Sequence, residues 1–166
     1  MEETIEILEA IPADYVSIAG IYNEYIELGN ATMDETLKTE SDIAGWVSNF
    51  HDRERLYVMK ENGVNIGWGI IKRYSDREGY RFACETAVYL TQSKLGMGLG
   101  PRMKQHLIEV CEQLNYRHLV AKIFAKNTAS IAYNEKMGYT IVGRQNQIGY
   151  KDGEWQDVVI MQKLIM

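Results

Sequence analysis

Three glycines at alternate positions form the stretch of this sequence with the clearest chemical potential. Gly96, Gly98 and Gly100 follow a run of β-formers at residues 88–90 and a polar turn, and apolar residues at helical spacing come after them. A strand therefore leads into a glycine loop, and the loop leads into a helix. Glycines let the backbone approach a ligand closely, and the free N–H groups at a helix start attract anions, phosphate above all. The pattern favours a phosphate cradle, and a tight, closely packed turn is the competing interpretation.

Two familiar phosphate-binding motifs have other requirements. A Walker loop needs a Lys followed by Ser or Thr after its last glycine, and this chain has Pro101 and Arg102 there. A Rossmann fingerprint needs its third glycine three residues after the second, with an acidic residue about twenty positions further on. The alternate spacing of this loop, past the middle of the chain, matches neither motif.

A single carboxylate interrupts the segment that precedes the glycine loop. Glu85 lies three residues before Val88, among residues that are otherwise small or apolar. A carboxylate in such a segment either serves as a general base or lies on the exposed face of an antiparallel strand. Residue type and position leave both interpretations open.

Composition and charge limit the class of protein. The 166 residues are expected to form one domain over residues 1–166, and 46% hydrophobic with 25% charged residues is typical of a soluble globular protein. A net charge of −5 argues against a nucleic-acid surface. No apolar run approaches the roughly 20 residues of a membrane span. The two cysteines, Cys84 and Cys111, form neither a disulfide framework nor a metal-ligand spacing, so we expect no metal site and a cytoplasmic location.

Hydrophobic periodicity and turn residues predict the elements that position this loop. Strands are expected at residues 4–8, 56–59, 64–71, 82–90, 118–125 and 139–143, with a last strand ending near residue 164. Helices are expected from residue 12 to about 29, from about 41, from the glycine loop to about 115, and from 127 to 138. The order β-α-α-β-β-β-α-β-α-β-β predicts an α+β domain in which helices flank a mixed, mostly antiparallel sheet.

This order, with the glycine loop between the fourth strand and the third helix, resembles the GCN5-related N-acetyltransferase (GNAT) family. Shorter stretches resemble one branch of that family, the phosphinothricin and methionine sulfoximine acetyltransferases. The matching stretches are residues 21–26, 31–32, the glycine loop, 127–131, 135–139 and 149–158. They cover nearly the whole chain in the right order, so the resemblance is specific.

The resemblance implies transfer of an acetyl group from acetyl-CoA, the co-substrate, to a primary amine. It places the CoA pyrophosphate on the loop and the pantetheine arm beside the preceding strand. The implied cofactor-binding residues are Val88, Tyr89, Leu90, Gly96, Met97, Gly98, Leu99, Gly100, Pro101 and Asn127. Pro101 lacks the N–H that a further loop residue would donate, and Asn127 is equally a plausible helix N-cap. Leu95 stands where the family often has Gln or Arg.

The chemistry needs an acceptor for the amine proton, and the branch has a glutamate at the position of Glu85. We therefore interpret Glu85 as the general base, acting directly or through a water. The backbone N–H near Tyr89 or Leu90 is the candidate oxyanion donor. The residue that protonates the leaving thiolate in many relatives, a Tyr or His, is Asn134 here, which cannot act as an acid at neutral pH. The neighbouring Tyr133 is expected to point ~100° away from that position.

The substrate loop departs from the branch, because Tyr74 and Ser75 replace a Trp-Arg pair that grips an amino-acid carboxylate. Arginines nearby are the candidate substitutes. The predicted substrate-binding residues are Ser75, Asp76, Arg77, Arg81, Glu85, Thr86 and Ala87. The expected substrate is a small amino-acid-like amine. A polyamine or peptide amine, which the acidic charge balance favours, and a non-catalytic acyl-CoA-binding module are the alternatives. The first helix and the last hairpin are the expected interface of a homodimer, and neither nucleic acid nor membrane is expected as a partner.

Overall fold

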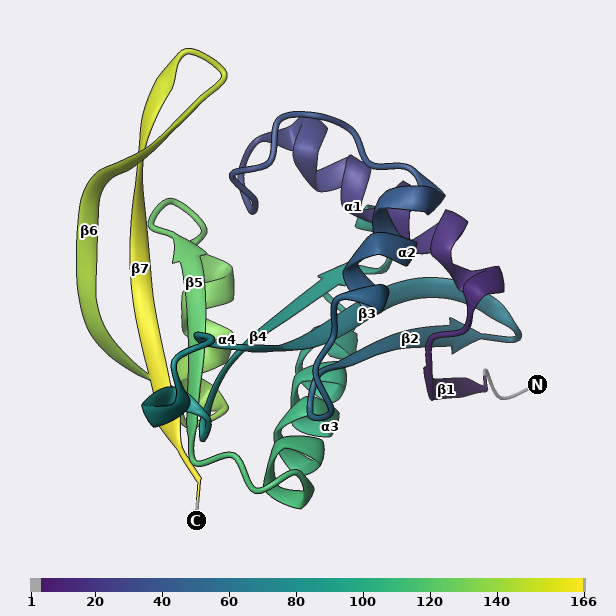
Figure 1. Cartoon of the computed structure of the whole chain (residues 1–166). Helices are drawn as coiled ribbons and strands as arrows, with labels where there is room; N and C mark the ends of the chain where they lie inside the picture. The colour runs from purple at the N-terminus through teal and green to yellow at the C-terminus, as the bar shows by residue number, and fades with distance from the viewer. Residues whose placement is uncertain (1–3, 166) are drawn as a thin grey trace.

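The computed structural model describes residues 4–165 and has one seven-stranded sheet with helices packed around it (Figure 1). The strands are β1 (Ile5–Glu9), β2 (Arg55–Glu61), β3 (Val64–Arg73), β4 (Ala83–Leu90), β5 (His118–Phe124), β6 (Thr140–Lys151) and β7 (Glu154–Leu164). The α-helices are α1 (Tyr15–Leu28), α2 (Glu40–Ser48), α3 (Leu99–Gln113) and α4 (Thr128–Lys136). Short 3-10 turns are η1 (Pro12–Asp14), η2 (Glu78–Tyr80) and η3 (Gln92–Lys94). The predicted order of strands and helices is confirmed.

Local sequence signals explain where several elements begin and end. Thr39 caps α2 by accepting a hydrogen bond from the N–H of Asp42, whose carboxylate accepts one from the N–H of Thr39 in return. Gly29 ends α1 in the left-handed conformation, with φ of 71°. The turn between β2 and β3 places Asn62 and Gly63 at φ of 51° and 84°, which is the geometry of a tight hairpin.

The sheet order is β1-β2-β3-β4-β5-β7-β6, and neighbouring strands run antiparallel except for β4 and β5. The parallel ladder between β4 and β5 has three rungs, which pair Ala83 with His118, Cys84 with Leu119 and Glu85 with Val120. Beyond Glu85 the two strands diverge, as Figure 1 shows. Residues 86–90 continue their pairing with β3, while residues 121–124 pair with β7. The centre of the sheet is therefore split.

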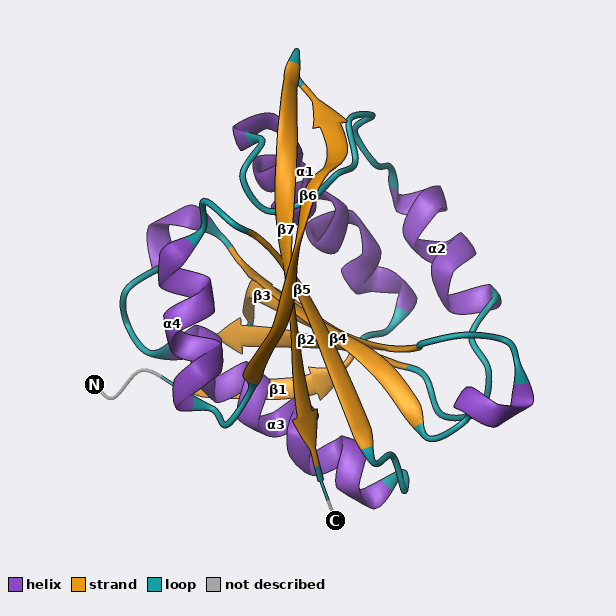
Figure 2. Cartoon of the chain, turned by 90° about the vertical axis from the view of Figure 1, so that its left-hand side faces the viewer, coloured by secondary structure: helices purple, strands orange, loops and turns teal. Residues whose placement is uncertain are grey.

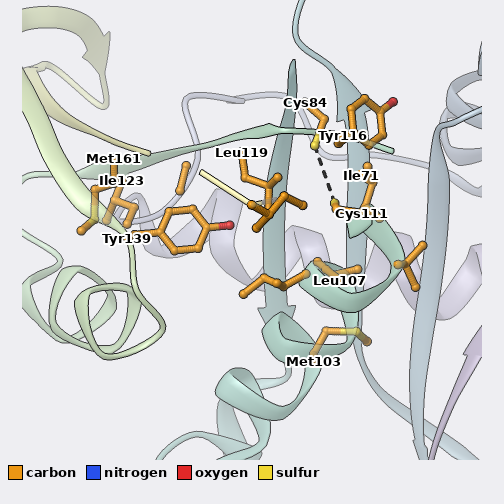
Figure 3. Close-up of a cluster of buried hydrophobic side chains, with 14 of the residues drawn as sticks. Ile71, Cys84, Met103, Leu107, Cys111, Tyr116, Leu119, Ile123, Tyr139 and Met161 are labelled. Atoms are coloured by element: carbon orange, nitrogen blue, oxygen red, sulfur yellow. Dashed lines mark hydrogen bonds between the residues drawn. The ribbon is translucent and has the colours of Figure 1, made fainter. Parts of the chain in front are cut away.

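Alternate residues of β3 and β4 face two separate cores, one on each side of the sheet. The side toward α3 includes Ile71, Cys84, Leu90, Met103 and Leu107, and Figure 3 shows part of this cluster around the neighbouring Sγ atoms of Cys84 and Cys111. The side toward α1 and α2 contains Ile18, Tyr22, Ile43, Trp68 and Ile70. The helix α3 approaches β3 closely, because a Cβ at Gly69 would lie 2.9 Å from Met103. Successive residues of β4 thus reach different compartments.

The strand β6 is longer than the expected 139–143. It extends to Lys151, with register shifts between Ile141 and Gly143 and between Gln145 and Gly149. Gln147 has a φ of 54° in the second irregular stretch. Most side chains of this edge strand are exposed, and apolar and polar residues do not alternate along it, so the two-residue alternation that marks a half-buried strand is missing from its sequence. Pairing with β7 holds it in place, and the hairpin extends beyond the rest of the sheet (Figure 2).

Candidate functional site

The divergence of β4 and β5 opens a cavity that we call the split pocket. It has a volume of about 520 Å³ and is lined by residues 86–90 of β4, residues 121–124 of β5, the glycine loop and one side of α4. The glycine loop lies at its mouth, where η3 leads into α3. A backbone edge of β4 faces this space beyond the last rung of the parallel ladder. An extended ligand can therefore enter between the strands and pair with backbone as a strand would.

The glycine loop has the geometry of an anion cradle. Gly96 and Gly98 have φ of 78° and 76°, which favours glycine, and Gly98 is the N-cap of α3. A Cβ added at either glycine would meet no protein atom within 4 Å. The space beside the loop is thus open, and the first N–H groups of a 15-residue helix are directed to its N-terminal end. These residues fit a pyrophosphate group.

The loop is anchored from α1. Glu24 accepts hydrogen bonds from the N–H of Gln92 and the hydroxyl of Thr91, each at 2.8 Å. Of the ten cofactor-binding residues expected from the sequence, all except Met97 and Leu99 line the split pocket. Asn127 lines it and also caps α4, since its Oδ1 accepts the N–H of Ser130 at 3.2 Å. The two interpretations of Asn127 are therefore compatible.

Both Tyr133 and Asn134 line the split pocket, although successive side chains of a helix are ~100° apart. The pocket is wide enough at α4 for two successive helical side chains to border it. Asn134 is 2% exposed and donates from Nδ2 to the carbonyl of Ser130 at 2.8 Å. Its Oδ1 has no hydrogen-bond partner within residues 4–165. A buried acceptor of this kind is a place for a donor from a bound ligand.

Glu85 does not line the split pocket, although its neighbours Thr86 and Ala87 and its ion-pair partner Lys122 do. It lines two cavities that meet near it: a hairpin pocket of about 1,100 Å³ and a loop pocket of about 530 Å³. The hairpin pocket lies between residues 31–34, β5 and the β6–β7 hairpin, and the loop pocket lies between Trp46, Trp68, residues 72–76 and Glu85. Glu85 Oε2 is 3.5 Å from Lys122 Nζ. A half-buried carboxylate at the junction of these cavities can take a proton from an amine that enters through them.

The predicted substrate residues divide into two groups. Ser75, Asp76, Glu85, Thr86 and Ala87 line the loop pocket. The other two, Arg77 and Arg81, are exposed and line none of the three pockets.

Local contacts hold Arg81 elsewhere. Its guanidinium lies 4.7 Å from the centre of the Phe82 ring and donates to the carbonyl of Glu78. Substrate binding through either of the two exposed arginines stays a prediction without support from these contacts.

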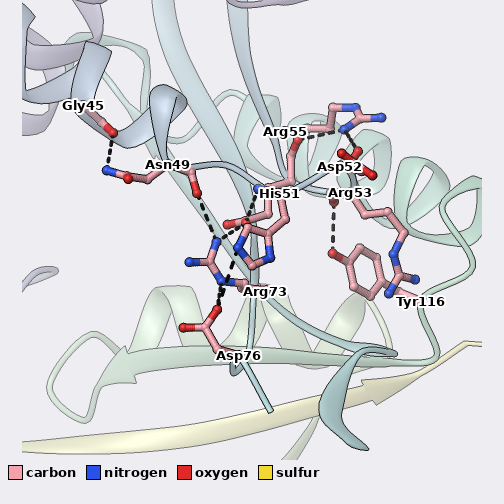
Figure 4. Close-up of polar contacts among 10 residues, drawn as sticks. Gly45, Asn49, His51, Asp52, Arg53, Arg55, Arg73, Asp76 and Tyr116 are labelled. Carbon is pink, nitrogen blue, oxygen red and sulfur yellow. Dashed lines mark hydrogen bonds and ion pairs between the residues drawn. The ribbon is translucent and has the colours of Figure 1, made fainter. Parts of the chain in front are cut away.

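A polar network holds the loop after β3. The guanidinium of Arg73 contacts the buried carboxylate of Glu54 and lies 2.6 Å from Asp76, and His51 approaches Asp76 from the other side (Figure 4). Arg73 also donates to the carbonyl of Asn49, so the end of α2 and the substrate loop share one cation. The hydrogen bonds and ion pairs of Arg73 raise its pKa above the ordinary value. This arginine is committed to structure, although it borders the loop pocket.

Three lysines near the site were missed from the sequence. Lys72 and Lys122 line both pockets beside Glu85, and their strand positions share a face with it. Lys104 is buried on α3 and lines the split pocket. A signal for Lys104 existed, because it lies four residues before Ile108 and directly after Met103, within the buried stripe of α3. Charged residues inside an apolar stripe are rare unless they have a specific role.

Aromatic side chains form the wall of the loop pocket on the side of α1. Tyr22 contacts the rings of Trp46, Trp68 and Tyr89 edge-on, with centroids 5.1–5.6 Å apart. Trp68 stacks on Tyr89 at 4.7 Å. Burial raises the pKa of Tyr22 and Tyr89, so the hydroxyls of these two tyrosines stay neutral at physiological pH. The wall suits the apolar part of a small ligand.

Within the described residues, no three His, Cys, Asp or Glu side chains gather as metal ligands, and none of the helices there is long and apolar enough to cross a membrane. The chain matches a family model described as an acetyltransferase (GNAT) domain over residues 7–160. It is 32% identical to an L-methionine sulfoximine/L-methionine sulfone acetyltransferase of Pseudomonas aeruginosa, over 94% of this chain and 92% of that protein.

Two solved structures are similar over nearly their whole length. A GNAT superfamily phosphinothricin acetyltransferase from Sinorhizobium meliloti, in complex with acetyl-CoA, superposes with a TM-score of 0.91 at 30% identity, over 99% of this chain and 89% of that one. A ribosomal-protein-alanine N-acetyltransferase from Brucella melitensis superposes with a TM-score of 0.93 at 31% identity, over 96% of this chain and 99% of that one.

Proposed function

The chain belongs to the GNAT acetyltransferase family, and from this premise we propose that it transfers the acetyl group of acetyl-CoA to the primary amine of a small amino-acid-like substrate. The expected substrate type is phosphinothricin or methionine sulfoximine. One observation carries the proposal. The split pocket, which suits an extended, phosphorylated ligand, and the loop pocket, which contains the Glu85 carboxylate, are adjacent at β4, where Thr86 and Ala87 line both. The catalytic and binding residues named below are part of this proposal.

Acetyl-CoA supplies an activated acetyl thioester. The glycine loop and the start of α3 bind its pyrophosphate, and the backbone of residues 88–90 pairs with its pantetheine arm. Asn127 and Asn134 offer polar groups along the α4 side of the split pocket. The fit rests on the open space beside Gly96 and Gly98 and on the unpartnered Oδ1 of Asn134.

Glu85 removes the proton of the substrate ammonium group, because a protonated amine has no lone pair with which to attack a carbonyl. Lys122 orients the carboxylate at 3.5 Å. Lys72 and Lys122 also provide two positive charges at the pockets beside Glu85, which supports a substrate that carries a carboxylate. These lysines are our candidates for the role that the Trp-Arg pair has in similar proteins.

A peptide N-terminus is the second candidate substrate. The hairpin pocket is the largest of the three, and the similar Brucella protein is named for acetylation of a ribosomal protein. A pocket of about 1,100 Å³ accommodates more than one residue of an extended peptide. The acidic balance of the chain favours cationic amines as well.

We further propose a homodimer formed through the β6–β7 hairpin. Val142, Ile148, Tyr150 and Trp155 are each more than half exposed there. In the first helix Tyr15, Tyr22 and Tyr25 are buried inside the subunit, so its part of the interface would come from exposed side chains such as Val16 and Leu28. The cytoplasm remains the expected compartment.

The test is acetyl-CoA-dependent thiol release with a panel of amines: methionine sulfoximine, phosphinothricin, methionine sulfone, free amino acids, spermidine, and peptides with a free N-terminus or a lysine. We expect turnover on the sulfoximine or phosphinothricin. Turnover on peptides or spermidine alone would show that the substrate is a peptide amine or a polyamine and not an amino-acid-like compound. A protein that gains thermal stability from acetyl-CoA but acetylates nothing in the panel would be an acyl-CoA-binding module.

A further inference from the structure

A buried lysine lies at the split pocket without a carboxylate partner. Lys104 is 2% exposed, and its Nζ donates to the hydroxyl of Thr86 at 2.8 Å. The Thr86 hydroxyl is also 2.9 Å from the hydroxyl of Tyr139, and the Lys104 ammonium lies 4.7 Å from the centre of the Tyr139 ring. Within residues 4–165, no carboxylate oxygen lies within ion-pair distance of Lys104. Burial of an ammonium among neutral groups costs free energy. A functional role of the charge would explain why a lysine occupies this position.

The groups around Lys104 come from every element packed against it. Thr86 and Cys84 reach it from β4, Cys111 from α3 itself, and Tyr139 from the segment before β6. Tyr133 and Asn134 border the same pocket from α4. The carboxylate that acts on Lys104 at longer range is that of Glu85. None of these groups neutralises the ammonium inside the pocket.

Glu85 and Thr86 are consecutive on β4, so their side chains lie on opposite faces of the sheet. Glu85 faces the hairpin and loop pockets, and Thr86 holds Lys104 on the side of the split pocket and α3. A proton acceptor and a cation are therefore separated by the thickness of one strand. This arrangement suits acyl transfer, which is assisted by a base near the attacking amine and a proton donor near the leaving thiol.

We propose that Lys104 is the catalytic residue that protonates the leaving sulfur of CoA. The inference rests on the proposed acetyltransferase function. As the carbon–sulfur bond breaks, its electron pair goes to sulfur, and sulfur takes a proton from the Lys104 ammonium. Glu85 takes one proton from the substrate ammonium before the attack and a second from the same nitrogen as the amide forms, and it releases both to solvent. The neutral Lys104 amine regains a proton from solvent. The net reaction converts ammonium and thioester into amide, thiol and one proton released to solvent.

The proton affinity of Lys104 suits this role. Burial lowers its pKa to about 8, close to that of an ordinary thiol at about 8.5. Proton transfer between groups of similar pKa is nearly balanced in free energy, and the lysine is still mostly protonated at neutral pH. Asn134, at the position where relatives have an acid, has no proton to give. Lys104 lines the same pocket.

The variants Lys104→Met and Lys104→Gln test the proposal. Methionine fills the volume without charge, and glutamine keeps a donor for Thr86 but cannot transfer a proton. We expect kcat at saturating acetyl-CoA to fall by roughly 10²–10⁴-fold in both variants, with KM for acetyl-CoA little changed. The wild-type rate should fall as the pH rises above about 8, and this basic limb should be absent from the residual activity of both variants. Lys136→Gln, which changes an exposed lysine at the end of α4 that lines none of the three pockets, serves as the matched control and should keep both the rate and the basic limb.

A second measurement does not depend on turnover. The thiol of bound CoA is titrated through its ultraviolet thiolate absorbance in wild type and in Lys104→Gln. We expect thiolate to form at least about one pH unit lower in the wild-type complex, because a nearby ammonium stabilises the anion. Identical titrations would overturn the proposal even if no amine in the panel were acetylated, so its failure is distinguishable from that of the proposed function. A wild-type rate in Lys104→Gln, loss of the basic limb in Lys136→Gln, or an acetyl adduct on Lys104 after incubation with acetyl-CoA alone would also overturn it.

Discussion

Lys122 Nζ lies 3.5 Å from Glu85 Oε2, next to the last rung of the parallel ladder between β4 and β5. Glu85 pairs with Val120, and Lys122 is two residues further along β5 on the same face. The ion pair therefore fixes the carboxylate at the point where the sheet splits. Since roughly half of the Lys122 side chain is exposed, its main effect is to orient Glu85 rather than to stabilise the fold.

Replacement of Glu85 by glutamine tests its role as general base. We expect Glu85→Gln to lower kcat by roughly 10²–10⁴-fold, because the amide has no basic oxygen for the amine proton. Binding of acetyl-CoA, measured by calorimetry, should stay near normal, since Glu85 does not line the split pocket. Glu9→Gln removes an exposed strand carboxylate on β1 and is the control. A fully active Glu85→Gln would remove this residue from the mechanism.

The open space beside the glycine loop predicts a large effect of a side chain at Gly98. Gly98→Val should raise the apparent constant for acetyl-CoA sharply, because a branched side chain would occupy the space assigned to pyrophosphate. Gly63→Val is a matched control: Gly63 has a φ of 84°, and its Cβ would also meet nothing within 4 Å. Both variants carry a backbone strain of about 1–2 kcal/mol. Equal affinity for acetyl-CoA in the two would show that the anion binds elsewhere.

The hydrogen bonds from Thr91 and Gln92 to Glu24 anchor the loop before α3 to α1. Loss of this anchor is expected to raise the apparent constant for acetyl-CoA less than Gly98→Val does. Glu24→Ala removes the acceptor of the Gln92 N–H and the Thr91 hydroxyl. We expect KM for acetyl-CoA to rise roughly tenfold, the equivalent of one charge-assisted hydrogen bond, while kcat stays within about a factor of two. Glu27→Ala, on the exposed side of the same helix, should change neither constant. A normal KM in Glu24→Ala would show that the loop holds its shape without the anchor.

The buried ammonium of Lys104 predicts a specific dependence of stability on pH. Its pKa is about 8 in the folded protein and about 10.5 in the unfolded chain. Below pH 8 both states are protonated, and folding bears the full cost of the buried charge. Between pH 8 and 10.5 the unfolded chain binds more protons, so stability rises with pH.

The comparison with Lys104→Met isolates this effect. Wild type should gain up to about 3 kcal/mol of unfolding free energy relative to Lys104→Met across that range. Urea unfolding of both proteins at a series of pH values measures the difference. Burial also raises the pKa of Tyr25 and of Tyr116 to about 12. The contributions of these two tyrosines to stability are the same in both proteins and cancel in the difference. A difference that does not change with pH would show that the lysine is not buried as a titrating group.

The exposed apolar side chains of the β6–β7 hairpin predict a change of oligomeric state. Trp155→Glu is expected to convert a dimer into a monomer, because a charge at the centre of an apolar interface must be desolvated. Light scattering coupled to size-exclusion chromatography measures the mass. Val64→Glu changes a side chain that is 65% exposed in the distant β2–β3 hairpin, and this variant should remain dimeric. A monomeric wild-type protein would refute the proposed dimer.

The order of the elements and the place of the glycine loop could be predicted from the sequence. These depend on local features: the alternation in β2 and β3, the turn at Gly63, the capping box at Thr39 and the helical spacing of α3. The sequence also placed Glu85 and the glycines close together along the chain. Local signals of this kind are readable because each depends on neighbouring residues.

The tertiary structure decided what these residues face. The split after Glu85 depends on where β4 and β5 stop pairing, which involves residues 35 positions apart in the chain, such as Glu85 and Val120. The contact of Lys104 with Thr86 likewise depends on the packing of α3 against β4, whereas Arg81 is held by its sequence neighbours Glu78 and Phe82. The length of β6 follows from its partner β7 rather than from its own polar sequence. Long-range packing sets the environment of a side chain, and the environment decides whether a lysine or an arginine is a solvated charge or part of a site.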